Sequence, residues 1–207
     1  MKINALCTSD PMIALNHCDR VVYCGENRYD DERVDVYNTY IGQTDGGNIY
    51  IHSMLDDDLL NDACDYILNN GVHAIVRAAY DLTEAGLIEA RHKLSPIMLL
   101  HKYGVLDRCT IAGGVCLDND DLDLMAQEGV PLVVLPTYSA GSGHGYAPVC
   151  AAVARGIRVG IGTFDGAYNP AADIDGEIRF LNLTANAAMS KEGALSQSDM
   201  DRILRFQ

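Results

Sequence analysis

Short apolar runs alternate with longer stretches of helical periodicity from residue 48 onwards. The runs are apolar on both faces, as buried parallel strands are. They cover residues 48–54, 72–79, 108–115, 131–136 and 157–162. Stretches with helical periodicity separate the first four runs, at residues 56–71, 82–104 and 118–129. Strand and helix therefore alternate through short connections, which predicts βα units with right-handed crossovers in a parallel sheet or barrel.

The ends of the helical stretches carry residues typical of helix termini. The acidic run at 56–58 suits the positive end of a helix dipole, and Gly71 suits a left-handed C-cap. Thr83 is a candidate N-cap for the next helix, and Pro96 predicts a kink or a restart within it. Gly129 predicts the end of the third helix.

The chain before residue 48 shows less regular patterning. Residues 20–25 predict another strand, and the charged segment 26–35 predicts a solvated loop. Residues 34–42 are compatible with a strand or a helix. We therefore predict a single α/β domain over residues 1–207, in which residues 1–47 receive the least specific assignment.

The composition and the net charge of the chain argue against some classes of binding partner. The hydrophobic content of 48% is enough for a sizeable core. The formal net charge of -14 would repel phosphate backbones and anionic lipid surfaces, so nucleic acid and membrane are not expected partners. The sequence shows no apolar run of membrane-spanning length and no signal peptide, which predicts a cytoplasmic protein. Its seven cysteines lack any CxxC pair, so we expect reduced thiols rather than disulfides or a zinc knuckle.

Three polar residues fall where a barrel enzyme would place its chemistry. Asp165 follows the strand at 157–162 and could be a metal ligand, a general base or a turn residue that caps local N–H groups. His52, at the end of the strand 48–54, could contact substrate or be a structural histidine. His144 lies in the Gly-rich segment SAGSGHGYAP and could contact substrate or be a plain surface residue. We therefore take Asp165 as the candidate catalytic residue, and His52 and His144 as candidate substrate-binding residues.

Three phrases in the second half of the chain carry a resemblance to a known family. They are IAGGVCL at 111–117, LPTYSAGSGHGYAPV at 135–149 and IGTFDGAYN at 161–169. Their order and spacing resemble the amidohydrolase superfamily, in the branch of chlorohydrolases and of nucleobase and thioadenosine deaminases. That resemblance implies an incomplete TIM-like (β/α) barrel whose parallel strands correspond to about strands 3 to 8 of the family.

The resemblance also implies a metal centre whose ligand positions are altered here. The family's first strand carries a His-x-His pair, and this sequence contains none. The His and Glu of the fifth strand fall on Ile75 and Ala78, and the His of the sixth falls on Gly113. The Asp of the eighth strand falls on Phe164, unless one inserted residue lets Asp165 take its place. We therefore expect no cofactor in this chain, although the family would use zinc or iron.

A second register remains open for the fifth strand. In it the segment YIHSML supplies His52 as the ligand, but Leu55 then replaces the Glu. In the preferred register His52 lies on the fourth strand, near a substrate-contacting histidine of the family.

These expectations leave three functional hypotheses. The resemblance implies an ancestral hydrolysis of a non-peptide C–N bond, the deamination of a ring amine, and the altered ligand positions predict a chain that is inactive on its own. In the first hypothesis the chain has a binding or scaffold role, with a small molecule as ligand. In the second it is an aminohydrolase that uses non-standard ligands or a complementing chain. In the third it is a homodimeric assembly subunit, because a six-stranded piece would leave open strand edges.

Overall fold

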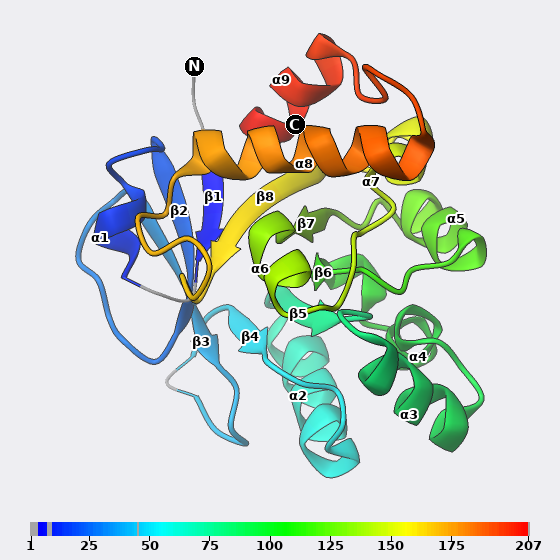
Figure 1. Ribbon diagram of the computed structural model, residues 1–207. Coiled ribbons are helices and arrows are strands. Elements are labelled where there is room, and N and C mark those ends of the chain that lie inside the picture. Colours follow the sequence, from blue (N-terminus) through cyan, green and yellow to red (C-terminus); the bar gives the residue numbers. More distant parts are fainter. Residues whose placement is uncertain (1–3, 8–9, 45, 207) are drawn as a thin grey trace.

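The computed structural model describes residues 4–7, 10–44 and 46–206, and shows a barrel of parallel strands (Figure 1). The strands are β1 (Asn4–Cys7), β2 (Arg20–Gly25), β3 (Val34–Thr39), β4 (Ile49–Ile51), β5 (Ala74–Ala78), β6 (Cys109–Gly113), β7 (Leu132–Val134) and β8 (Val159–Phe164). Each strand pairs in parallel with its sequence neighbour, and β1 also pairs with β8, so the sheet closes. The predicted α/β class and TIM-like barrel are confirmed.

The barrel has eight strands in the described part of the chain, whereas the sequence predicted a six-stranded piece. The strand predicted at 20–25 is the second of the barrel, because β1 precedes it, and the ambiguous segment 34–42 contains β3. Closure by β1 and β8 removes the open edges that motivated the expectation of a homodimer or a complementing chain. That expectation about partners stays a prediction.

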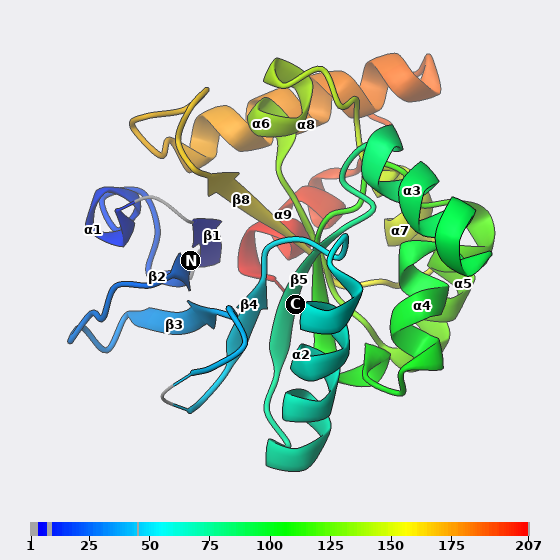
Figure 2. The same ribbon diagram turned by 90° about the horizontal axis from the view of Figure 1, so that it is seen from below.

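The barrel is incomplete in its outer layer of helices. The helices are α1 (Pro11–Ala14), α2 (Asp57–Asn70), α3 (Leu82–His92), α4 (Pro96–Lys102), η1 (Leu106–Arg108), α5 (Asn119–Glu128), α6 (Pro136–Gly141), α7 (Val149–Ala154), α8 (Ile174–Met189) and α9 (Gln197–Arg205). Among the described residues, no helix lies between β2 and β3 or between β3 and β4. Figure 2 shows α2 to α5 gathered on one side of the barrel, with β2, β3 and the short α1 on the other.

Local side chains begin and end several helices as the sequence indicates. Asp56 caps α2 through Leu59 N, and Gly71 ends that helix with a left-handed backbone. Ser95 caps α4, so Pro96 restarts a helix rather than kinking one. The N-cap of α3 is Asp81 and not Thr83, because the Asp81 carboxylate accepts from Glu84 N.

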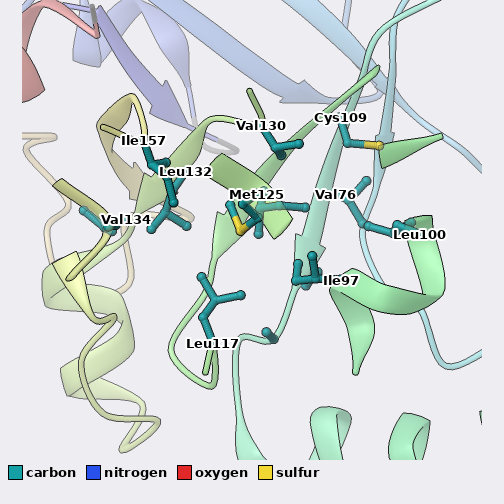
Figure 3. Packing of buried hydrophobic residues seen from close by; sticks show 14 of the residues in the cluster. Val76, Ile97, Leu100, Cys109, Leu117, Met125, Val130, Leu132, Val134 and Ile157 are labelled. Atoms are coloured by element: carbon teal, nitrogen blue, oxygen red, sulfur yellow. The ribbon is translucent and has the colours of Figure 1, made fainter. Parts of the chain in front are cut away.

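The main hydrophobic core lies between the outer face of the barrel and its helices (Figure 3). Alternate residues of β5, such as Val76, meet Ile97 and Leu100 of α4. Leu132 of β7 and Met125 of α5 belong to the same cluster. Cys109 is fully buried in this core, where burial raises the pKa of its thiol and the thiol donates to Val105 O. This thiol is a packed core group, and it is reduced as expected.

A second, smaller core fills the inside of the barrel. It contains Cys24, Tyr50, Ile75, Ala112, Val133, Leu135 and Phe164. Phe206, which follows α9, packs against this cluster and, with Ile75 and Gly160, lines a small cavity of about 60 Å³ in the barrel. A Cβ on Gly160 would lie only 2.4 Å from the Phe206 ring, which explains the glycine at this position. None of the helices in the described part of the chain has the length and apolar composition needed to cross a membrane.

Candidate functional site

The C-terminal ends of the strands form one end of the barrel, the mouth, where barrel enzymes bind their substrates. Five side chains meet there, and we call them the mouth cluster: Arg77, Tyr80, Tyr138, His144 and Phe164. They come from β5 and the turn after it, from α6 and the loop that follows, and from the last residue of β8. The barrel thus brings together residues that are up to 87 positions apart in the chain.

Arg77 reaches the mouth because of the alternation along β5. Ile75 belongs to the barrel interior, whereas Ala74, Val76 and Ala78 belong to the outer core. Arg77 lies on the same face of the strand as Ile75, one step nearer the C-terminal end. Its side chain is 7% exposed, so a charged guanidinium is buried where the strand ends.

Aromatic rings surround this guanidinium. Its carbon lies 3.6 Å from the centre of the Tyr80 ring and 5.0 Å from that of Phe164. Arg77 Nη2 donates to the Tyr138 hydroxyl at 3.4 Å, and Arg77 Nε is buried without a hydrogen-bond partner. Cation–π contacts are worth roughly 0.5–2 kcal/mol each, whereas burying a charge without a counter-ion costs several kcal/mol. The rings therefore orient the guanidinium but do not compensate its burial.

Tyr138, His144 and Phe164 form the opposite wall of the mouth. The Tyr138 ring lies 4.3 Å from the Phe164 ring and 5.9 Å from the His144 ring, between centroids. His144 Nε2 lies 3.8 Å from an Asp81 oxygen, and its Nδ1 is buried without a partner. The structure therefore places His144 at the mouth, as its candidate role requires.

Glu84 lies beneath this cluster at the start of α3. It is 1% exposed, and its Oε2 accepts from Tyr80 N while Oε1 has no hydrogen-bond partner. Burial raises the pKa of this carboxyl group to about 7, and the positive charge of Arg77 opposes that rise. Glu84 is therefore a buried group that titrates near neutral pH.

His52 occupies the rim of the mouth, directly after β4. It is exposed, and its ring lies 5.9 Å from the ring of Tyr50, whose hydroxyl is 3.4 Å from His52 Nδ1. Partial burial and the nearby charge of Arg77 lower the pKa of His52. The structure thus brings His52 and His144 to the same end of the barrel, and their role in substrate binding stays a prediction.

Asp165 lies apart from these groups in the turn after β8. It is exposed, and its carboxylate accepts from Ala167 N at 2.9 Å. This geometry supports the turn role over the catalytic one, because the carboxylate bonds the local backbone rather than facing the barrel.

Replacing Asp165 by alanine tests that assignment. We expect a loss of about 0.5–1 kcal/mol in the free energy of unfolding, typical of one local hydrogen bond, and no change in ligand binding at the mouth. Chemical denaturation and ligand titration of the variant measure both. A tenfold loss of ligand affinity with unchanged stability would show instead that Asp165 contributes to ligand binding.

The structure corrects the positions to which the resemblance assigned metal ligands on β5. Ile75 lies deep in the barrel interior and Ala78 lies in the outer core. The residues of this segment that reach the mouth, also three apart, are Arg77 of β5 and Tyr80 of the turn after it. The assignment to Ile75 and Ala78 was therefore wrong by two residues, because intervening lengths do not reveal which face of a strand points inward.

The equivalent positions on β6 and β8 were placed correctly at the mouth. Gly113 ends β6 with φ of +101°, and a Cβ there would lie 2.8 Å from Tyr80 Cβ. Phe164 ends β8 with φ of +54° and is 5% exposed against Tyr138. Neither residue offers an atom that binds a metal ion.

Arg77, Tyr80 and Tyr138 were not identified from the sequence. The signal that could have found Arg77 is the alternation in AIVRAAY, where the arginine shares the inward face with Ile75. Tyr138 lacked such a signal, because the helix α6 that carries it follows Pro136 inside a segment expected to be a loop.

Curated proteins similar to this chain are hydrolases and deaminases. The chain is 35% identical over 94 residues to a 5-methylthioadenosine/S-adenosylhomocysteine deaminase of Caldicellulosiruptor saccharolyticus, which covers 45% of this chain and 22% of that protein. It is 35% identical over 103 residues to an S-triazine hydrolase of Gordonia rubripertincta, covering 49% and 22%. A deaminase of the first kind from Haloarcula marismortui is 28% identical over 155 residues, covering 72% and 36%. The chain thus spans well under half the length of these relatives, and no protein-family model matches it.

Solved structures share the fold at low sequence identity. A zinc-bound adenosine deaminase from Xanthomonas campestris superposes with a TM-score of 0.71 at 20% identity, covering 84% of this chain and 38% of that one. The atrazine chlorohydrolase of Arthrobacter aurescens complexed with zinc gives 0.69 at 19%, covering 97% and 53%. These likenesses establish the barrel.

The zinc in these neighbours corrects the expectation that no cofactor is used. Two structures with this fold contain the metal, so the absence of a cofactor does not follow for a chain of this kind. The mouth as described does not fit a zinc ion, because Arg77 is a cation and because Gly113 and Phe164 lack ligand atoms. Over the described residues no group of three or more His, Cys, Asp or Glu side chains could hold a metal. Ligands for zinc would have to come from outside these residues, and we derive no chemical step through a metal.

The sequence relatives and the fold agree with one another. The relatives found by sequence are named as deaminases and a triazine hydrolase, and the solved neighbours include a deaminase and a chlorohydrolase on the same barrel. The phrases at 111–117, 135–149 and 161–169 form β6, the segment around α6 and β8, which together make half of the mouth. The chain is therefore similar in sequence to amidohydrolases over about half of its length, and it shares their barrel fold.

Proposed function

We propose that this chain binds a small ring-containing molecule at the mouth of the barrel, and that its own side chains do not hydrolyse a C–N bond. The observation that carries the proposal is the mouth cluster itself. Four ring side chains and one arginine from separate elements converge there, with ring centroids 4.3–5.9 Å apart. Such groups stack on and hydrogen-bond to a planar ligand.

The same positions lack the groups that hydrolysis needs. Relatives named as deaminases replace an amine by water, and a metal-bound water of lowered pKa is the usual nucleophile in such sites. At the ends of β5 and β8, where the relatives' barrel would hold its metal, this chain has Arg77, Tyr80 and Phe164, none of which generates a hydroxide near neutral pH. Glu84 titrates near neutrality but lies buried beneath Tyr80.

The test uses the compounds named for the relatives, S-adenosylhomocysteine and 5-methylthioadenosine. With added zinc, we expect ammonia release no faster than without protein, while the NMR signals of the Tyr138 and His144 rings shift on titration. The variant Tyr138→Ala should lose this binding. Tyr146→Ala removes a 52% exposed tyrosine of the following loop and serves as the matched control. Ammonia release in proportion to protein concentration would refute the proposal.

A second candidate is a C–N hydrolase completed by ligands from elsewhere. It is favoured by the names of the relatives and by the small share of their length that this chain spans. Stoichiometric zinc in protein purified without chelator, together with ammonia release from either nucleoside, would support it over the first candidate.

A further inference from the structure

We propose that the ligand at the mouth carries an oxyanion, a carboxylate or a phosphate, which binds the guanidinium of Arg77. This inference rests on the proposed function and specifies the chemistry of its ligand. The observation behind it is the buried positive charge of Arg77.

Arg77 is a buried cation that has no ion-pair partner among the described residues. It is 7% exposed, and no carboxylate oxygen of the described residues lies within 4.0 Å of its guanidinium nitrogens. Several other arginines of the described chain are paired, such as Arg91 with Asp57 and Arg155 with Asp123 at 2.8 and 2.6 Å. A buried charge needs a partner to offset its lost hydration, so an anion bound to Arg77 would offset the cost of its burial.

The incomplete hydrogen bonding of Arg77 also supports an oxyanion ligand. Its Nε is buried with no acceptor, and its one hydrogen bond, to Tyr138, is long at 3.4 Å. A guanidinium can donate two parallel bonds to a carboxylate or a phosphate. The Tyr80 ring at 3.6 Å covers one face of the guanidinium and leaves its edge as the direction for such a pair.

Three ionisable residues lie near this site, and only His144 is placed to add a hydrogen bond. His144 packs on Tyr80 and Tyr138, and its buried Nδ1 has no partner, so it can donate a further bond to an oxyanion in the tautomer that protonates Nδ1. Glu84 is the carboxyl group whose charge Arg77 influences, but it is beyond ion-pair distance and is engaged with Tyr80 N. Asp81 faces His144 at 3.8 Å rather than Arg77.

The measurement must report on the mouth alone, because the chain has a second cavity that an aromatic probe could enter. A cavity of about 310 Å³ lies outside the barrel between α6, α7 and α8, with an apolar lining that includes Leu181 and Ala185. An aromatic compound bound there would change bulk signals such as melting temperature. We therefore choose the NMR resonance of the Arg77 Nε–H group as the primary measurement.

The experiment titrates wild-type protein with benzoate, inorganic phosphate and benzamide, the neutral counterpart of benzoate. We expect the Arg77 resonance to shift with one or both anions, at a dissociation constant at least tenfold lower than that of benzamide. Benzoate alone identifies a carboxylate ligand, and phosphate alone a phosphorylated one. Arg77→Met should lose anion affinity at least tenfold and unfold at higher denaturant, because it removes an unpaired buried charge. Arg158→Met is the matched control, since Arg158 is exposed and lies 5.8 Å over the Phe206 ring at the other end of the barrel.

Equal affinity for benzoate and benzamide at the mouth would overturn the inference and leave the proposed function intact. An Arg77 resonance unmoved by all three probes would also overturn it, and the nucleoside titration would then decide separately whether the mouth binds small molecules. Since the resonance is measured on wild-type protein, the test holds even if Arg77→Met does not fold.

Discussion

Replacing Gly113 by alanine is expected to lower the free energy of unfolding by about 3 kcal/mol. The new Cβ would lie 2.8 Å from Tyr80 Cβ, and the backbone has φ of +101°, where a side chain is strained. Strain at such a φ costs 1–3 kcal/mol and overpacking a further 1–3 kcal/mol, so roughly 3 kcal/mol is a moderate sum. Denaturation by urea measures the loss.

The matched control for Gly113→Ala is Gly46→Ala. Gly46 has φ of +105°, and a Cβ there would meet no atom within 4 Å, so this variant isolates the backbone strain from the collision. Equal losses in the two variants would show that Tyr80 does not crowd Gly113. A larger loss at Gly113 means that a histidine cannot return to this end of β6 while Tyr80 occupies the mouth.

Replacing Glu84 by glutamine is expected to stabilise the protein relative to wild type by about 3 kcal/mol more at pH 8 than at pH 4. The quantity compared is the free energy of unfolding. Burial raises the folded pKa of Glu84 to about 7, above its value of 4.5 in an unfolded chain. The stability due to the protonated group is therefore fully present below pH 4.5 and is lost as pH rises through 7. A shift of this size corresponds to about 3 kcal/mol, at roughly 1.4 kcal/mol per pH unit.

Glutamine removes this loss because it stays neutral and still accepts from Tyr80 N. Urea denaturation from pH 4 to 8 measures the difference between the two proteins. Glu89→Gln, an exposed residue of the same helix, should leave the pH dependence unchanged. Parallel curves for wild type and Glu84→Gln would mean that Arg77 keeps Glu84 ionised throughout and that burial does not dominate.

The strands from β4 onwards could be predicted because each is a continuous apolar run bounded by helix caps. Such a pattern depends on neighbours in the chain, as at Asp56 and Gly71 for α2. β1 was missed and β3 was left ambiguous because they lie where helices are few, so the alternation of strand and helix gave no guide there.

Two of the five residues of the mouth cluster could be predicted as well. His144 and Phe164 were placed at the mouth by motifs with the order and spacing of a known family. Asp165 lies next to Phe164 along the chain but bonds its own turn, because one residue after an inward position of a strand the side chain points elsewhere.

The sequence by itself determined the parallel α/β barrel, the resemblance to the amidohydrolase superfamily and the change of that family's metal-ligand positions on β6 and β8, because these follow from local periodicity and from motif order. Only the tertiary structure decided that the sheet closes through β1 and β8, and that Arg77 rather than Ile75 faces the mouth. Both depend on which face of a strand turns inward and on contacts between residues far apart in the chain. The unpaired charge of Arg77 is likewise a property of the assembled barrel, since no carboxylate oxygen of the described residues lies within 4.0 Å of its guanidinium nitrogens.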